Sequence, residues 1–134
     1  RLREKAESIL ELVELLPFKD QRGRNLTLGR QRVLEIARAL AMEPKLLILD
    51  EPAAGMNLSE KEWLVQVIRR INESGISILL IEHHMPVVMS LAKRIAVMNF
   101  GVKIADGVPE QIKNDHAVIE AYLGRQNDDV TFES

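Results

Sequence analysis

The sequence predicts an α/β fold in which a mostly parallel sheet is flanked by helices. Two short apolar runs, residues 46–49 and 76–81, each end in a group of polar side chains. Segments with helical periodicity precede, separate and follow these runs, and such alternation is typical of α/β architecture. Because open α/β sheets bind ligands beyond the carboxyl ends of their parallel strands, the polar groups mark the candidate functional site.

The first part of the chain is predicted to be mainly helical. Apolar side chains recur with a helical period from Leu2 to Leu16, and Pro17 is expected to end this helix. A glycine, an asparagine and scattered charges in residues 18–28 favour a connector. A second helix is expected from about Arg30 to Met42, so two helices precede the first strand.

The middle of the chain predicts a strand, a helix and a second strand. The unbroken apolar run Leu46 to Leu49 is typical of a strand buried on both faces of a parallel sheet. Ser59 and Glu62 have the spacing of a capping box, so a helix is expected over about residues 59–73. Residues 76–81 predict the second buried strand.

The last part of the chain predicts shorter elements and a polar tail that we expect to be flexible. The elements are a helix over 86–92, a strand pair at 95–99 and 102–105 joined by a tight turn at Phe100-Gly101, a last helix over 115–122, and the tail 125–134.

Composition limits the function classes. A hydrophobic content of 46% is enough for a real core. The formal net charge of −2 gives no basic field of the kind that attracts nucleic acid, so no nucleic-acid partner is expected. The absence of cysteine excludes disulfides and thiolate metal sites. No apolar run in the sequence approaches the roughly 18 residues of a membrane-spanning helix.

Two adjacent carboxylates, Asp50 and Glu51, follow the first apolar run. Carboxylates at the end of a buried strand cost stability unless a cation or donors meet them, and a magnesium–phosphate site supplies both. In such a site Asp50 would bind the metal, directly or through water, and Glu51 would activate the attacking water as general base. A solvent-exposed carboxylate pair in a loop is the alternative.

The second apolar run ends in Glu82, His83 and His84. An imidazole at this place could donate a hydrogen bond to a terminal phosphate, because both ring nitrogens can take part in hydrogen bonding. A structural or simply exposed histidine is the alternative. With no cysteine and only one more histidine, His116, the pair does not predict a zinc site.

A turn of small residues, Leu26 to Gln31, leads directly into the second helix. A helix start has free backbone N–H groups and a positive dipole end, so it can hold an anionic phosphate. Gly29 is the only glycine in this turn, and a plain junction between a loop and a helix is the alternative.

The order and spacing of these segments strongly resemble the ABC ATPase family. The segments are the helix-start turn, VLEIARALAMEPKLLILDEP, AAGMN, and a strand ending in IEHH. The resemblance implies a signature sequence at Leu26–Arg30, in which Thr27, Gly29, Arg30 and Gln31 would face ATP held by a second subunit. It implies a Walker B strand at Leu46–Asp50, with Asp50 binding Mg²⁺ through water, followed by a catalytic Glu51. It also implies a D-loop that contains Asn57 and a switch histidine at His83.

Three residues of the signature depart from the usual Leu-Ser-Gly-Gly-Gln of the family. They are Thr27, Leu28 and Arg30. His84 also stands where the family usually has aspartate after the switch histidine. These departures affect the expected geometry of the phosphate contacts and the hydrogen bonds next to His83.

Within the family, several phrases resemble the ATP-binding subunits of bacterial branched-chain amino acid importers, while their urea and amide relatives stay open. The phrases are LDEPAAGMN, ILLIEHHM, GVPEQIKND and VIEAYLG. The resemblance implies ATP hydrolysis that energises import, with ATP and Mg²⁺ as cofactors. It also implies a second ABC ATPase subunit in a homo- or heterodimer, transmembrane permease subunits, and a peripheral place on the cytoplasmic face of the inner membrane.

The resemblance further implies that the chain is the C-terminal portion of one nucleotide-binding domain. Residues 1–42 would belong to the helical signature region and residues 43–124 to the α/β region that carries Walker B and the switch histidine. None of the seven glycines is followed by Lys-Ser or Lys-Thr, so this sequence contains no P-loop. We therefore expect further sequence upstream, and a chain that is inactive alone.

Two other interpretations stay open. An ABC-like domain could act as an interaction or regulatory module in which nucleotide controls assembly rather than transport. Alternatively, the chain is an isolated fragment without activity. Half of a sheet leaves an exposed edge and an apolar patch, so self-association is expected if the chain folds alone.

Overall fold

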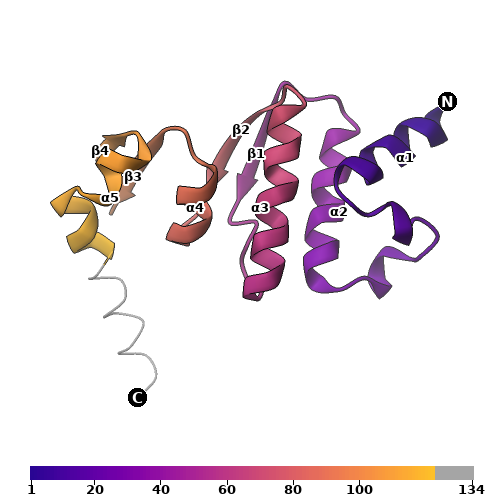
Figure 1. The fold of residues 1–134 in the computed structure, drawn as a ribbon, viewed down its shortest axis with the longest axis horizontal. Coiled ribbons are helices and arrows are strands. Elements are labelled where there is room, and N and C mark those ends of the chain that lie inside the picture. The colour runs from indigo at the N-terminus through magenta and orange to yellow at the C-terminus, as the bar shows by residue number, and fades with distance from the viewer. Residues whose placement is uncertain (123–134) are drawn as a thin grey trace, which may run out of the picture. The chain divides into compact units, whose positions relative to one another are not determined.

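The computed structural model describes residues 1–122, which form two compact units (Figure 1). The first unit comprises Arg1–Leu91, and the second begins at Ala92. The polar tail 125–134 lies outside the described residues. Within residues 1–122, no helix combines the length and the apolar character that crossing a membrane requires.

The first helix, α1 (Leu2–Leu12), ends earlier than the sequence predicted. The chain turns at Glu14, whose φ is +60°, and Leu15 beyond it is buried. Pro17 lies in a 3₁₀ helix, η1 (Leu16–Phe18), where its fixed φ suits the first turn. The expectation that Pro17 ends the first helix is therefore wrong, because the helix has already ended before the proline.

The second helix, α2 (Leu28–Leu40), begins before the predicted Arg30. Thr27 is its N-cap, and the Thr27 hydroxyl oxygen accepts a hydrogen bond of 3.4 Å from the Arg30 amide. The predicted connector before it contains one turn of 3₁₀ helix, η2 (Gly23–Asn25).

The strands β1 (Leu46–Asp50) and β2 (Ser77–Ile81) pair in parallel, which confirms the α/β prediction for this unit. Leu47 and Leu49 are buried on the face of β1 that meets the core. Ile48 is 58% exposed and its cross-strand partner Leu79 is 51% exposed. The prediction that β1 is buried on both faces is thus wrong for residues 1–122, because only one face of this sheet is covered.

The third helix, α3 (Leu58–Glu73), follows a turn in which Gly55 has a φ of +76°. Its capping box is formed by Asn57 and Glu60, not by the predicted Ser59 and Glu62. The Glu60 amide donates to Asn57 Oδ1 at 2.9 Å, and the Asn57 amide donates to Glu60 Oε2 at 3.2 Å. The helix therefore starts earlier than predicted.

One hydrophobic core joins α1, α2 and α3 to the inner face of the sheet. Val13, Val33, Leu64, Val67 and Ile71 are completely buried within it. Helix α4 (Met85–Leu91) adds Val87 to this core and packs against α3. This core fixes the position of β1 and β2, so the polar residues that follow each strand are held on a rigid support.

The second unit is built on an antiparallel pair, β3 (Ile95–Asn99) and β4 (Val102–Gly107), as predicted. Phe100 and Gly101 connect the strands with φ values of +47° and +77°, which is the pattern of a type I′ turn. A short helix, α5 (Pro109–Lys113), was not predicted from the sequence. Residues 116–122 are helical, in agreement with the predicted last helix.

Candidate functional site

The polar residues that follow β1 and β2 lie at the same edge of the sheet. Asp50 is paired with Ile81, so the two strands end side by side. The Glu51 amide donates to the Ile81 carbonyl at 2.7 Å, which carries the pairing one residue past β1. Glu51 and His83 are consequently neighbours in space, although 32 residues separate them in the sequence.

The Glu51 and His83 side chains are in direct contact. His83 Nδ1 lies 2.8 Å from Glu51 Oε1, and both side chains are at least half exposed. Because a carboxylate oxygen only accepts, Nδ1 carries the proton in this contact. The other ring nitrogen, Nε2, is then left for a ligand. The Glu51 carboxylate can orient a water molecule, and the neighbouring His83 ring can contact a phosphate group at the same site.

Glu51 adopts a left-handed backbone conformation, with φ of +46°. This region is uncommon for residues other than glycine, and it costs about 1 kcal/mol or more when the surroundings impose it. The hydrogen bond from the Glu51 amide to Ile81 holds the conformation from one side. In this conformation the Glu51 carboxylate is in contact with the His83 ring.

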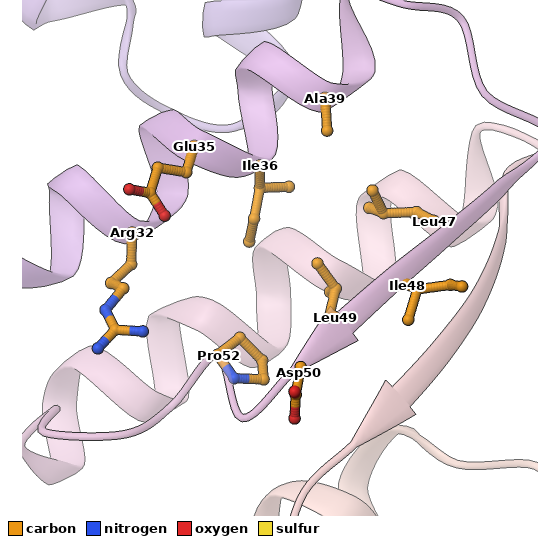
Figure 2. Close-up of a pocket in the computed structure, with 9 residues that line it drawn as sticks. All are labelled: Arg32, Glu35, Ile36, Ala39, Leu47, Ile48, Leu49, Asp50 and Pro52. Atoms are coloured by element: carbon orange, nitrogen blue, oxygen red, sulfur yellow. The ribbon is translucent and has the colours of Figure 1, made fainter.

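The carboxylate of Asp50 stands free at the end of β1. It lines an open pocket of ≈ 210 Å³ between α2 and β1, together with Arg32 from α2 (Figure 2). Within residues 1–122 it makes no hydrogen bond and no ion pair, and no group of three potential metal ligands occurs there. A single free carboxylate fits Mg²⁺ that is held mainly by phosphates and water, because this ion takes few protein ligands in such sites.

Glu82 is a residue of this site whose role the sequence did not reveal. Its side chain is only 1% exposed, and it accepts hydrogen bonds from the backbone amides of Ala53 at 3.3 Å and His83 at 3.1 Å. The His84 amide is also within 3.4 Å of the same carboxylate. Its strand-end position was visible in the sequence, but its partner Ala53 follows the other strand, and no local pattern indicates that contact.

His84, which replaces the aspartate usual in the family, is packed into the protein. Its Nδ1 is buried and has no hydrogen-bond partner within the described residues. A buried polar atom without a partner costs on the order of 1–3 kcal/mol. Within residues 1–122, His84 thus leaves an unpaired buried ring nitrogen beside His83. Its expected effect on the hydrogen bonds of His83 stays a prediction.

The predicted signature residues lie at the start of α2, and several of their side chains make local contacts. The Gln31 amide nitrogen donates to the carbonyl oxygens of Gly23 and Leu26, at 3.3 and 3.1 Å. The Arg30 guanidinium lies over the Phe18 ring, 4.0 Å from its centroid. These two side chains stabilise the connector. The Arg30 amide donates to Thr27, so the amides of Leu28 and Gly29 in the first turn of α2 are the ones that could meet an anion.

The start of α2 lies against the predicted D-loop of the same chain. A Cβ atom at Gly29 would be 3.2 Å from Glu60 Cδ, and one at Gly55 would be 3.5 Å from Leu28. The Asn57 side chain is occupied as the N-cap of α3. The structure therefore brings residues 27–31 together with residues 55–60, and Asp50 and Glu51 together with His83.

Two family profiles match the chain. Residues 1–54 match the profile described as "ABC transporter", and residues 102–127 match the one described as "Branched-chain amino acid ATP-binding cassette transporter". The first match lies in the first unit, and the second begins in the second unit.

Two curated relatives are both named as branched-chain amino acid transport ATP-binding proteins. The chain is 46% identical over 122 residues to the high-affinity branched-chain amino acid transport ATP-binding protein LivG of Escherichia coli (strain K12), which covers 90% of the chain and 48% of LivG. It is 47% identical over 116 residues to BraF of Pseudomonas aeruginosa, covering 86% of the chain and 46% of BraF. The chain thus spans about half the length of the curated relatives it matches.

The fold is similar to that of solved ATP-binding cassettes. The ADP conformation of MJ1267, described as an ATP-binding cassette of an ABC transporter, superposes with a TM-score of 0.83 at 31% identity, over 92% of this chain and 50% of that chain. The resemblance seen in the sequence is therefore confirmed by relatives and by fold. The chain belongs to the family of ABC transporter ATP-binding proteins.

Proposed function

We propose that the chain is the C-terminal portion of an ATP-binding subunit that energises a membrane importer of branched-chain amino acids. The proposal is supported by the 2.8 Å contact between His83 and Glu51 at the edge of the sheet, and by the names of the relatives. The part of the relatives' length that is not matched would carry the phosphate-binding loop that this sequence lacks.

Glu51, His83 and Asp50 would have different roles in ATP hydrolysis. Glu51, whose carboxylate contacts His83, would accept a proton from the attacking water. In the doubly protonated form of its ring, His83 would donate from Nδ1 to Glu51 and from Nε2 to the terminal phosphate. The free carboxylate of Asp50 would hold Mg²⁺ through water, and Mg²⁺ would neutralise charge on the phosphates.

A second subunit would be needed to complete the site. The backbone amides at the start of α2, around Thr27 and Gly29, would face ATP held by the partner's phosphate-binding loop, in a homo- or heterodimer. Arg30 and Gln31 would shape this surface through their contacts with Phe18 and the connector. Asn57 would act through the start of α3. Permease subunits would place the dimer at the cytoplasmic face of the membrane.

The test is ATP turnover of the full-length protein in complex with its permease subunits. Replacing Glu51 by Gln removes the base but keeps the size of the side chain. We expect turnover to fall by about 10²- to 10⁴-fold while ATP binding is retained. Glu73→Gln, an exposed change at the end of α3, is the matched control. Undiminished turnover in Glu51→Gln would refute the assigned base.

Substrate identity requires a separate measurement, because in this proposal the permease and binding subunits choose the solute. ATP-dependent uptake of leucine, isoleucine and valine into vesicles that contain the complete transporter is the expected result. Uptake of urea or an amide in place of these amino acids would keep the ATPase assignment and overturn the proposed substrate.

A further inference from the structure

The side chain of Glu82 is enclosed where its neighbours are open to solvent. Its exposed fraction is 1%, against 50% for Glu51 and 65% for His83. It follows directly after β2, so the backbone sets its position at the edge of the sheet. A carboxylate in such a place is not free to bind substrate, and its role must lie in what surrounds it.

Backbone amides surround this carboxylate. Oε2 accepts from the Ala53 amide at 3.3 Å, and Oε1 accepts from the His83 amide at 3.1 Å and lies 3.4 Å from the His84 amide. Such charge-assisted bonds offset the cost of burying a carboxylate. Among residues 1–122, the only basic side chain within 4.0 Å is that of His83, whose Nδ1 lies 3.7 Å from Oε1.

The two oxygens of Glu82 join two different loops. Ala53 belongs to the loop after β1, two residues beyond Glu51, and His83 belongs to the segment after β2. The Glu51 amide already donates to Ile81 across the same gap. The loop that carries Glu51 is thus tied to the second strand on both sides of Glu51, once through backbone and once through the Glu82 carboxylate.

We propose that Glu82 is a positioning residue that holds Glu51 and His83 at their mutual distance of 2.8 Å. The inference rests on the proposed ATPase function. Glu82 acts through the amides of Ala53 and His83 and does not touch the substrate. Without its carboxylate, the loop after β1 loses the bond from Ala53, and the Glu51 backbone is held only by its bond to Ile81 and by the turn bond from Ala54, so the reacting side chain is less well positioned. Misplacement of a reacting group by about 1 Å can lower the rate by about 10²-fold.

The Glu82→Gln variant of the full-length protein tests this directly. Glutamine has nearly the same shape, but its NH₂ group cannot accept, so one of the two loops loses its bond. We expect kcat for ATP hydrolysis to fall by about 10- to 100-fold and the KM for ATP to change by less than about threefold. Glu73→Gln, in which an exposed carboxylate is changed in the same way, should leave both values unchanged.

A double-mutant cycle separates positioning from plain stabilisation. In the His83→Ala background the contact with Glu51 is already lost, so Glu82→Gln should lower kcat by a smaller factor than it does in the wild type. The same fold-loss in both backgrounds would assign Glu82 to general stability and overturn the proposal. A Glu82→Gln enzyme with a wild-type kcat would overturn it as well.

A second variant covers the case in which glutamine prevents folding. Glu82→Asp keeps the charge but is one methylene shorter, so it reaches one loop only, and we expect the same loss of kcat in a folded protein. If neither variant folds, the carboxylate serves stability and the proposal is overturned. If the wild-type complex does not hydrolyse ATP, or Glu51→Gln retains full turnover, the proposed function fails instead, so the two failures are distinguishable.

Discussion

The amide of Glu51 lies 2.7 Å from the carbonyl oxygen of Ile81 and donates to it, one residue beyond the last paired position of β1. This hydrogen bond holds the loop after β1 next to the segment that follows β2. It explains why the Glu51 carboxylate and the His83 ring meet although they follow different strands. The geometry of the site is therefore a property of the sheet, and changes at its edge should act on hydrolysis.

Replacing His83 tests which ring nitrogen matters. In His83→Asn the side-chain NH₂ can still donate to Glu51, but nothing replaces Nε2, whereas His83→Ala removes both groups. If Nε2 faces the terminal phosphate, we expect both variants to lose about 10²-fold in kcat. The measurement is steady-state ATP turnover of the full-length complex. A His83→Asn enzyme with a nearly wild-type rate would show that the contact with Glu51 is the only function of the ring.

The close approach of Gly29 to Glu60 predicts a dependence between two substitutions. An alanine Cβ at Gly29 would lie 3.2 Å from Glu60 Cδ, so Glu60 has to move away from the Asn57 amide that it caps. We expect the lost cap to offset the better helix propensity of alanine, which is at most about 1 kcal/mol, so that the melting temperature hardly changes.

The same Gly29→Ala change should be stabilising when Glu60 is already alanine, because no carboxylate then occupies the space. Thermal unfolding of the two single variants and the double variant measures the coupling between the sites. Equal effects of Gly29→Ala in both backgrounds would mean that Glu60 yields without cost.

The ion cluster of the second unit predicts a pH dependence. Arg94 donates to both oxygens of Asp106, at 2.8 and 3.1 Å, and Lys103 is 3.2 Å from one of them. The hydrogen bond from Arg94, followed by that from Lys103, lowers the pKa of Asp106 to about 2 from its usual 3.8. Because this pKa is depressed in the folded state, the stabilisation is complete above the unfolded value and is lost as the pH falls toward 2.

The NMR signal of the Asp106 carboxyl carbon should therefore remain that of a carboxylate down to about pH 3, where an unpaired aspartic acid is mostly protonated. Arg94→Gln should shift the titration toward the usual range more than Lys103→Gln does, since Arg94 is the larger cause. A wild-type midpoint near the ordinary value would contradict the ion cluster.

The uncovered face of the parallel sheet predicts association when the 134-residue chain is isolated. Leu46, Ile48, Leu79 and Ile81 are between 47% and 58% exposed on this face. We expect light scattering to show dimers or larger species whose proportion rises with concentration. The double variant Ile48→Lys/Leu79→Glu places opposite charges on cross-strand partners and should reduce association.

Met42→Lys is the matched control for this measurement, because Met42 is 84% exposed but is not part of the sheet. It should leave the association unchanged. A wild-type chain that stays monomeric at all concentrations would contradict the prediction, and so would a double variant that associates like the wild type.

Much of the fold could be predicted because it depends on local patterns. The apolar runs of β1 and β2, the helical period of α3 and the turn at Phe100-Gly101 were all visible in the sequence. The end of α1 was not, because the turn at Glu14 is stabilised from a distance. Trp63 Nε1 and Arg70 each lie 2.6 Å from the Glu14 carboxylate, and both belong to α3.

Two other predictions were wrong because the sequence pattern was compatible with more than one structure. Asn57 with Glu60 and Ser59 with Glu62 have the same capping-box spacing, and the preceding turn at Gly55 selects the first pair. The apolar run of β1 is compatible with a sheet that is covered on one face or on both, so the exposure of Ile48 could not be predicted from the sequence.

The candidate site was predicted in its parts and not in its internal contacts. Asp50, Glu51 and His83 could be found because each closes an apolar run. The bonds of Glu82 could not be found, because they depend on how two loops meet. The roles assigned to these residues stay predictions until the variants are measured.

The left-handed backbone of Glu51 has a consequence for any saturation library at this codon. Valine, isoleucine and threonine resist positive φ, so they would impair activity through the main chain as well as through the missing carboxylate. Glycine accepts the conformation freely and has no side chain. Comparing the glycine and valine replacements would thus separate the cost of losing the base from the cost of forcing the peptide out of shape.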